Sequence, residues 1–214
     1  MKQLIIKVCG MRQGDNIMQT ERLAPDWMGF ICWNGSPRFI GSAPDYLPVS
    51  CLRVGVFVNP TVGYVREMMA RLNLDAVQLH GKESPHLCRE VKCLPGKDGR
   101  PPLLIKAFSI VPDAPFPDTS AYETVCDYFL FDTHCTTVGG SGKTFDWKCM
   151  ELYKGTRPFL LSGGIGEEHA EAIRRFKHPM WAGIDLNSRF ELAPALKDTE
   201  RLGRFIRLIR KQKH

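Results

Sequence analysis

The stretch IIKVCGM, residues 5–11, places a lysine and a cysteine in a run that otherwise has the composition of a buried β-strand. Side chains alternate between the two faces of a strand, so Lys7 and Cys9 share one face while Ile6 and Val8 share the other. Burying a charge without a partner is costly. The pair therefore indicates either an unusual core contact or one wall of a functional site.

Short apolar or β-branched runs of this kind recur along the 214 residues, with amphipathic or turn-rich segments between them. Strands that alternate with helices are typical of a parallel sheet, and eight such repeats predict closure into a barrel. We therefore expect the α/β class and a single (β/α)8 TIM barrel, with residues 1–214 as one domain. The expected strands are 4–9, 27–33, 53–58, 76–80, 103–108, 128–133, 158–162 and 182–187.

Two amphipathic helices are predicted by apolar residues at i, i+3, i+4 and i+7, one in 61–73 and one in the segment that starts at residue 199. Their apolar positions are Val65, Met68, Met69 and Leu72 in the first helix and Leu202, Phe205, Ile206 and Ile209 in the second. Arg201, Arg204 and Arg207 flank the second stripe, where we expect a solvated face rather than a nucleic-acid surface.

The charge balance is modestly basic, with 29 Lys and Arg against 23 Asp and Glu, a net charge of +6. This excess suits an anionic ligand and does not by itself indicate a DNA-binding protein. The eight cysteines form no C-x-x-C pair, which favours free thiols in a reducing cytoplasm. No secretory signal and no apolar run of about 18 residues is visible, so we expect a cytoplasmic protein without a membrane span.

Polar residues gather near the carboxyl ends of the expected strands, where barrels of this kind carry their chemistry. By strand alternation, nearly all of them are expected on the same face of the sheet. The groups are Lys7 with Cys9, Gln78 with His80, Leu130 with Asp132, Gly183 with Asp185 and Asn187, and Lys106 on the face away from Ile105 and Ala107. Because buried polar groups need partners, we expect these side chains to pair with one another, with water or with a ligand. Cys9 and Asp132 end their strands and could face each other across the barrel mouth.

Three loop segments after late strands could bind an anion: VGGSGKTFDW at 138–147, SGGIGEEHA at 162–170 and DLNSRFE at 185–191. The first fits neither a Walker loop nor G-x-G-x-x-G. The second predicts a strand end, a glycine turn and a helix start, which points backbone N–H groups at a phosphate. In GSPRFI, residues 35–40, the guanidinium of Arg38 suits a carboxylate, although a loop arginine is often only solvated.

Taken together, these segments resemble the phosphoribosylanthranilate isomerase family, (β/α)8 enzymes of tryptophan biosynthesis. The matching segments are KVCGM, GFICWNGSPRFI, VGVFVN, VQLHGKE, DT followed by GGSGKTFDW, LSGGI, and GIDLNSRFE followed by ALKD. Each fragment alone is unspecific, but their conjunction in this order is specific and runs almost end to end. The resemblance implies an intramolecular oxidoreductase of the aldose–ketose isomerase type. Its reaction is the Amadori rearrangement of N-(5-phosphoribosyl)anthranilate to 1-(2-carboxyphenylamino)-1-deoxyribulose 5-phosphate.

The resemblance also implies roles for individual residues. Cys9 would be the general base, Asp132 the general acid, and Arg38 the group that holds the anthranilate carboxylate. The other expected substrate-binding residues are Gln78, His80, Gly140, Ser141, Gly142, Gly163, Gly164, Asp185, Asn187 and Ser188. We expect no metal or cofactor, a small phosphorylated substrate, no nucleic-acid or membrane partner, and a monomer or homodimer.

The chain departs from the family pattern in one turn and at two single positions. Asn187, Ser188 and Arg189 stand where a Ser-Ser-Gly turn is usual, so Arg189 either reaches the phosphate or points away. Ala195 replaces a usual glycine, and Ile165 replaces a usual leucine.

Other functions stay open at this stage. A related sugar-phosphate isomerase of histidine biosynthesis or a sugar-phosphate epimerase would need paired catalytic aspartates or metal ligands at strand ends, and Cys9 disfavours both. A catalytically silent barrel is supported only by Arg189, and a nucleic-acid module only by the basic C-terminal segment.

Overall fold

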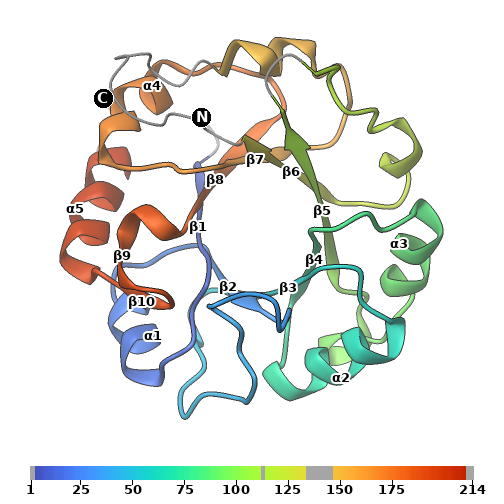
Figure 1. Ribbon diagram of the computed structural model, residues 1–214, viewed down its shortest axis with the longest axis horizontal. Helices are drawn as coiled ribbons and strands as arrows, with labels where there is room; N and C mark the ends of the chain where they lie inside the picture. Colours follow the sequence, from blue (N-terminus) through green and yellow to red (C-terminus); the bar gives the residue numbers. More distant parts are fainter. Residues whose placement is uncertain (1–2, 112–113, 134–146, 211–214) are drawn as a thin grey trace.

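Eight parallel strands form a closed barrel in chain order, and β8 pairs with β1 (Figure 1). The structure, a computed structural model, describes residues 3–111, 114–133 and 147–210. The strands are β1 Ile5–Val8, β2 Trp27–Ile31, β3 Leu52–Phe57, β4 Ala76–Leu79, β5 Leu103–Ile110, β6 Tyr128–Thr133, β7 Phe159–Ser162 and β8 Trp181–Leu186. The predicted (β/α)8 barrel is confirmed, and each expected strand lies within two residues of its predicted ends.

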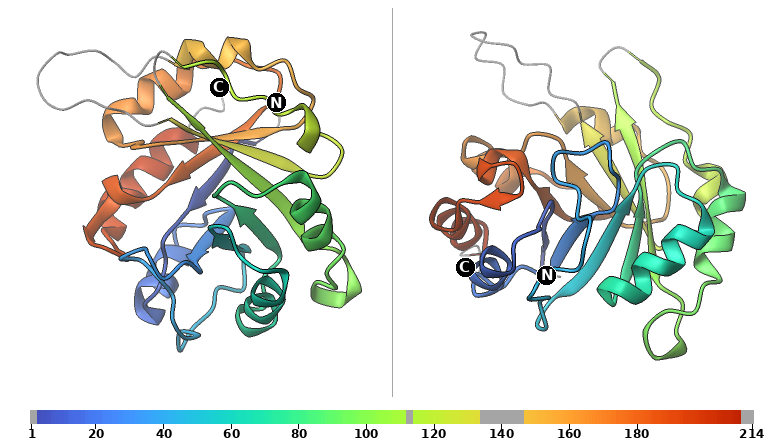
Figure 2. Two further views of the ribbon diagram at one scale, coloured as in Figure 1. Left: turned by 45° about the vertical axis from the view of Figure 1, so that its right-hand side comes forward. Right: turned by 60° about the horizontal axis from the view of Figure 1, so that its bottom comes forward.

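Helices surround the barrel on its outside (Figure 1). The α-helices are α1 Gly14–Glu21, α2 Val62–Leu72, α3 Pro85–Lys92, α4 Ala170–Arg175 and α5 Thr199–Arg210. Helix α2 begins where the Thr61 side chain accepts a hydrogen bond from the backbone of Tyr64, and it ends at Asn73 in the left-handed conformation. Figure 2 shows α1 and α5, from opposite ends of the sequence, lying side by side.

The alternation of strands and helices is incomplete. Residues 32–51, all of which the structure describes, join β2 to β3 without a helix. Their three prolines, Pro37, Pro44 and Pro48, disfavour a helix interior. Short 3-10 helices occupy other connections: η1 Lys97–Gly99, η2 Ser120–Tyr122, η3 Trp147–Leu152, η4 Glu167–His169 and η5 Ser188–Phe190. A small hairpin of β9 Glu191–Ala193 and β10 Leu196–Lys197 follows β8.

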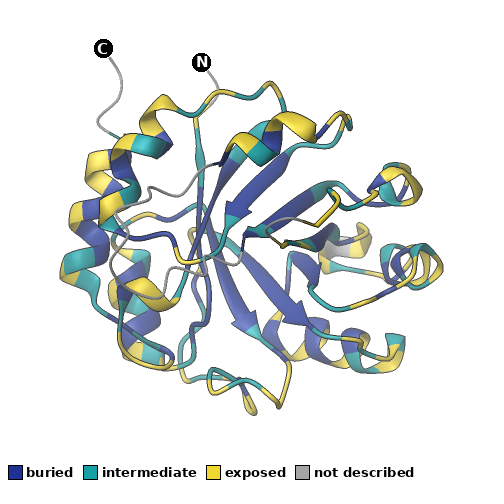
Figure 3. Ribbon diagram, turned by 45° about the horizontal axis from the view of Figure 1, so that its top comes forward, coloured by how far each residue is buried: buried dark blue, intermediate teal, exposed yellow. Residues whose placement is uncertain are grey.

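The core has two layers, separated by the barrel wall. The larger cluster includes α2 and α5 residues such as Val65 and Leu202, so it lies between the strands and the helices. The smaller cluster consists of strand residues and fills the barrel: Trp27, Val54, Ala76, Ile105, Ala107, Leu130 and Leu160. Figure 3 shows the strands buried and the outward faces of the helices exposed.

Lys106 corrects one part of the sequence interpretation. Its strand neighbours Ile105 and Ala107 belong to the inner cluster, so Lys106 lies on the outer face of β5, away from the barrel interior. Its ammonium donates to the carbonyl of Gly81 at 2.9 Å and pairs with Glu83 at 3.1 Å. The grouping of Lys106 with the inward polar residues was wrong, and the ion pair instead supports the loop after β4.

The basic flank of α5 is partly neutralised within the chain. Arg201 and Arg204 both approach the carboxylate of Glu167, at 3.0 Å and 3.7 Å. Arg204 is exposed, as expected for a solvated face, and Arg201 is half-buried. Among the described residues, no helix has the length and apolar character required to cross a membrane.

Candidate active site

A buried ion pair lies inside the barrel between β1 and β8. Lys7 and Asp185 are register partners on these strands, and the Nζ of Lys7 lies 2.9 Å from Oδ1 of Asp185. Burial alone would lower the pKa of Lys7, but the negative charges of Asp185 and Cys9 outweigh it and raise that pKa. Lys7 is therefore a fixed positive charge at the centre of the site.

Cys9 follows the last residue of β1 and is 3% exposed. A Cβ atom at Gly29, on neighbouring β2, would lie 2.7 Å from its Sγ and 3.1 Å from the Nζ of Lys7. The absence of a side chain at Gly29 thus leaves room for both groups. Burial raises the pKa of the Cys9 thiol, and the positive charge of Lys7 opposes part of this rise. Ionisation of the Cys9 thiol is therefore favoured by Lys7 and opposed by burial.

Asp132 lies one residue before the end of β6 and takes part in a polar chain with Gln78 on β4 and His80, which directly follows β4. Gln78 Nε2 lies 2.8 Å from His80 Nδ1, and His80 Nε2 lies 3.3 Å from Oδ2 of Asp132. Because the amide nitrogen of Gln78 is a donor, Nδ1 accepts and the ring proton sits on Nε2. His80 then donates to Asp132 and orients its carboxyl group.

A cavity of about 150 Å³ opens at the carboxyl ends of β6, β7 and β8. Its lining residues are Asp132, Ser162, Gly163, Gly164, Ile165, Asp185, Asn187, Ser188 and Arg189. Gly163 and Gly164 have φ of +104° and +63°, which glycine adopts without strain. A Cβ on Gly163 would lie 1.9 Å from the carbonyl oxygen of Thr133, so the turn passes directly against β6. The predicted glycine turn and two of the inward carboxylates therefore meet at one cavity.

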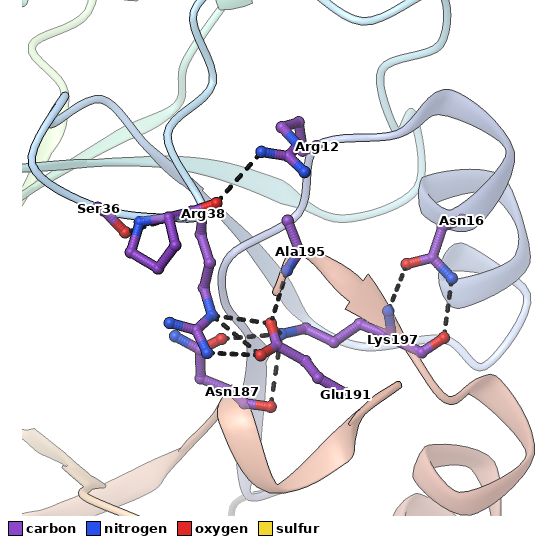
Figure 4. Close-up of polar contacts among 9 residues, drawn as sticks. Arg12, Asn16, Ser36, Arg38, Asn187, Glu191, Ala195 and Lys197 are labelled. Carbon is purple, nitrogen blue, oxygen red and sulfur yellow. Dashed lines mark hydrogen bonds and ion pairs between the residues drawn. The ribbon is translucent and has the colours of Figure 1, made fainter. Parts of the chain in front are cut away.

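Arg38 lies close to this centre but is not a free loop side chain. Its Nε and Nη2 donate to the carboxylate of Glu191 at 2.6–3.0 Å (Figure 4). Gly10, with φ of +79°, makes room for the cluster, because a Cβ there would lie 2.8 Å from Cδ of Arg38 and 2.7 Å from Oδ1 of Asn187. Gly10 directly follows Cys9 in the chain, so Arg38 lies beside the loop that begins at Cys9.

Comparison with known proteins identifies the family. Residues 6–207 match the family model described as N-(5'-phosphoribosyl)anthranilate (PRA) isomerase. The chain belongs to this family. The N-(5'-phosphoribosyl)anthranilate isomerase of Parabacteroides distasonis is 50% identical over 212 residues, which cover 96% of this chain and 93% of that protein. The isomerase of Phocaeicola vulgatus is 46% identical over 209 residues, covering 98% and 99%.

A solved phosphoribosyl anthranilate isomerase has a similar structure, with a TM-score of 0.74 and 25% identity. The match covers 98% of this chain and all of that one, which is in complex with reduced 1-(o-carboxyphenylamino)-1-deoxyribulose 5-phosphate. The resemblance inferred from the sequence is confirmed, and the other barrel families considered above are not the family of this chain.

Not every family segment can be placed. Gly140, Ser141 and Gly142, which the sequence predicts as phosphate contacts, lie outside the described residues. Arg189, the departure from the family's usual turn, donates through Nε to the Gly164 carbonyl at 3.4 Å and pairs with Glu168 at 3.1 Å. Its side chain thus lies across the glycine turn and toward the first helical residues after β7.

Several residues of the site were missed by the sequence analysis: Gly29, Ser162, Glu191 and Lys197. A signal existed for Gly29, because a glycine inside a strand often marks a close approach by another group. Lys197 is fully buried and pairs with Glu191 at 2.7 Å, a contact between two short strands of a hairpin. Both residues belong to family segments quoted above, GIDLNSRFE and ALKD, but local spacing gave no sign that they pair.

Proposed function

We propose that this chain catalyses the isomerisation of N-(5'-phosphoribosyl)anthranilate, the Amadori step of tryptophan biosynthesis. The observation that carries the proposal is the continuity of the site. Asp132 and Asp185 line one cavity, and Asp185 is joined through Lys7 to the position of Cys9. In this proposal Asp132 acts from the lining of the cavity, and Cys9, which is 3% exposed and is not one of the lining residues, acts from its position beside Lys7.

Asp132 is the proposed general acid. Its carboxyl group would protonate the ring oxygen of the ribose, which breaks the bond from that oxygen to C1 and leaves an iminium ion. Contact with His80 at 3.3 Å fixes the orientation of the carboxyl group. A positioned acid or base contributes about 10²–10⁴-fold to a rate.

Cys9 is the proposed general base. Its thiolate would remove the proton from C2, which the adjacent iminium makes acidic, and the resulting enolamine tautomerises to the aminoketose. Lys7 favours the thiolate against the effect of burial. In this scheme the protein supplies proton transfer, and the iminium of the substrate itself supplies the electron sink.

The glycine turn after β7 and the start of η5 are the proposed phosphate site. Gly163, Gly164 and Ser188 line the cavity, and their backbone N–H groups would bind the phosphate, as parallel barrels often bind phosphate after strands 7 and 8. Asn187 and Asp185 border the same cavity and would contact the opened sugar. Gln78 acts in this proposal through His80.

The activity is tested by mixing the purified chain with the substrate, with and without a metal chelator, and following the loss of substrate fluorescence. Cys9→Ala and Asp132→Asn should each lower kcat by about 10²–10⁴-fold while binding of the reduced product analogue persists. Cys32→Ala is the matched control, because Cys32 is another buried free thiol near a strand end but belongs to the outer core layer. Full activity of Cys9→Ala would remove the thiol from the mechanism.

The proposed partner is therefore a small phosphorylated molecule, with a cytoplasmic location as the expected setting for this pathway. A monomer and a homodimer are the two predicted assemblies, and light scattering of the purified chain distinguishes them.

A further inference from the structure

Among the residues that the structure describes, the guanidinium group of Arg38 contacts its partner through one edge. Glu191 accepts from Nε at 2.9 Å and 3.0 Å and from Nη2 at 2.6 Å, which is the side-on edge of the group. A guanidinium has five N–H donors in a planar fork, so the end-on edge formed by Nη1 and Nη2 keeps a second pair of parallel donors. That edge matches the two oxygens of another carboxylate.

Glu191 is itself held in place by the β9–β10 hairpin. Its Oε1 accepts from Nζ of Lys197 at 2.7 Å and from the backbone N–H of Ala195 at 3.2 Å. Lys197 is fully buried and also donates to Oδ1 of Asn187 at 2.8 Å. Figure 4 shows these contacts converging on one carboxylate, with the backbone of Lys197 fixed by Asn16 on α1. The carboxylate therefore has little freedom to leave Arg38.

The turn that carries Arg38 is fixed from the other side. Arg12 donates to the carbonyl of Pro37 at 3.2 Å, and the hydroxyl of Ser36 accepts from the backbone N–H of Arg38 at 3.1 Å. Both ends of the arginine side chain are thus held, the backbone by the loop and the guanidinium by Glu191. Because the backbone and the guanidinium of Arg38 are both held, the edge formed by Nη1 and Nη2 points in one direction.

The charges of the cluster sum to one positive charge, from Arg38 and Lys197 against Glu191. A partly buried cluster with one net positive charge is suited to one bound anion. Glu191 thus neutralises the charge of Lys197, and the positive charge of Arg38 remains available to bind a carboxylate. The hydrogen bonds that Arg38 donates to Glu191 raise the pKa of Arg38, which keeps the guanidinium charged.

We propose that Glu191, anchored by Lys197, is a positioning residue that turns the end-on edge of Arg38 toward the aryl carboxylate of the substrate and so sets specificity for a carboxylated aryl amine. This inference rests on the proposed function. It predicts that recognition of the carboxylate, rather than of the phosphate or the sugar, depends on Glu191.

The test compares two ligands in two proteins. The reduced product analogue and its counterpart without the aryl carboxylate are titrated against the wild-type chain and Glu191→Gln, and their affinity ratio is measured. Wild type should prefer the carboxylated ligand strongly, and Glu191→Gln should reduce that ratio at least tenfold, with a raised KM and a nearly unchanged kcat. The ligand without the carboxylate should bind both proteins equally. Glu171→Gln is the matched control, since Glu171 pairs with Arg175 on the exposed face of α4.

The outcomes separate the two proposals. Absence of turnover by the wild-type chain would contradict the proposed function itself. Turnover by wild type with an unchanged affinity ratio in Glu191→Gln would overturn the positioning role. Tighter binding of the carboxylated ligand by Glu191→Gln would also overturn it, because Glu191 would then compete for Arg38. If Glu191→Gln does not fold, Arg38→Lys keeps the charge without the fork, and a retained ratio in that variant refutes the inference.

Discussion

Lys7 and Asp185 form an ion pair inside the barrel, with Nζ 2.9 Å from Oδ1 and side-chain exposures of 0% and 5%. The two residues are 178 positions apart and become register partners only because β8 pairs with β1. Ser162 Oγ lies 3.4 Å from the second oxygen of Asp185. The pair links the cavity to the thiol of Cys9. The pairing of β8 with β1, which closes the barrel, therefore also brings the parts of the candidate site together.

Lys7→Met should destabilise the fold by about 3–5 kcal/mol, because it leaves the carboxylate of Asp185 buried without its partner. The same change should raise the pKa of Cys9 further and lower kcat/KM, since Lys7 favours the thiolate. Urea unfolding measures the first effect and initial rates the second. The double variant Lys7→Met with Asp185→Asn should be more stable than Lys7→Met alone. Additive losses in the double variant would contradict the pairing argument.

Gly29→Ala should lower kcat by about a hundredfold, the cost of a misplacement of roughly 1 Å in a catalytic group. The new Cβ would lie 2.7 Å from Sγ of Cys9, so the thiol must move. Gly63→Ala is the control, since a Cβ at Gly63 meets nothing within 4 Å. The comparison is a steady-state assay of both variants. An unchanged kcat in Gly29→Ala would show that the thiol has space that the structure does not show.

Gly163→Ala should weaken phosphate binding and destabilise the fold by about 1–3 kcal/mol or more. Its Cβ would lie 1.9 Å from a backbone oxygen of Thr133, and φ of +104° strains any residue with a side chain. Thermal unfolding with and without inorganic phosphate measures both effects, since a bound anion raises Tm. Normal stabilisation by phosphate in this variant would argue against the glycine turn as the anion site.

Glu191 should make stability depend on acid pH. Burial alone would raise the pKa of Glu191, but hydrogen bonds from Arg38 and Lys197 outweigh it and hold that pKa below the ordinary value of 4.5. The folded state then binds fewer protons than the unfolded state, so the stabilisation is present above pH 4.5 and is lost as pH falls through the lowered pKa. The difference in unfolding free energy between wild type and Glu191→Gln should therefore persist at pH 7 and shrink below pH 4.5. Urea titrations across this range check it, and a difference that is constant with pH would contradict it.

Alternation along single strands predicted much of the site. It grouped Lys7 with Cys9 and Gln78 with His80, and it placed Asp132 near a strand end, as the structure shows. It failed for Lys106, because strands of a parallel barrel are buried on both faces and carry apolar residues on both. Local periodicity alone then does not say which face of a strand points inward.

The sequence by itself determined the eight strands, the clustering of polar residues at their carboxyl ends, and the family to which the chain belongs. These features depend on local spacing and on the order of short segments. Only the tertiary structure decided that Asp185 pairs with Lys7 and that Glu191 holds Arg38, 153 positions away. Such pairs depend on the register in which the barrel closes and on the placement of a hairpin beyond its last strand, and no local pattern of residues encodes either.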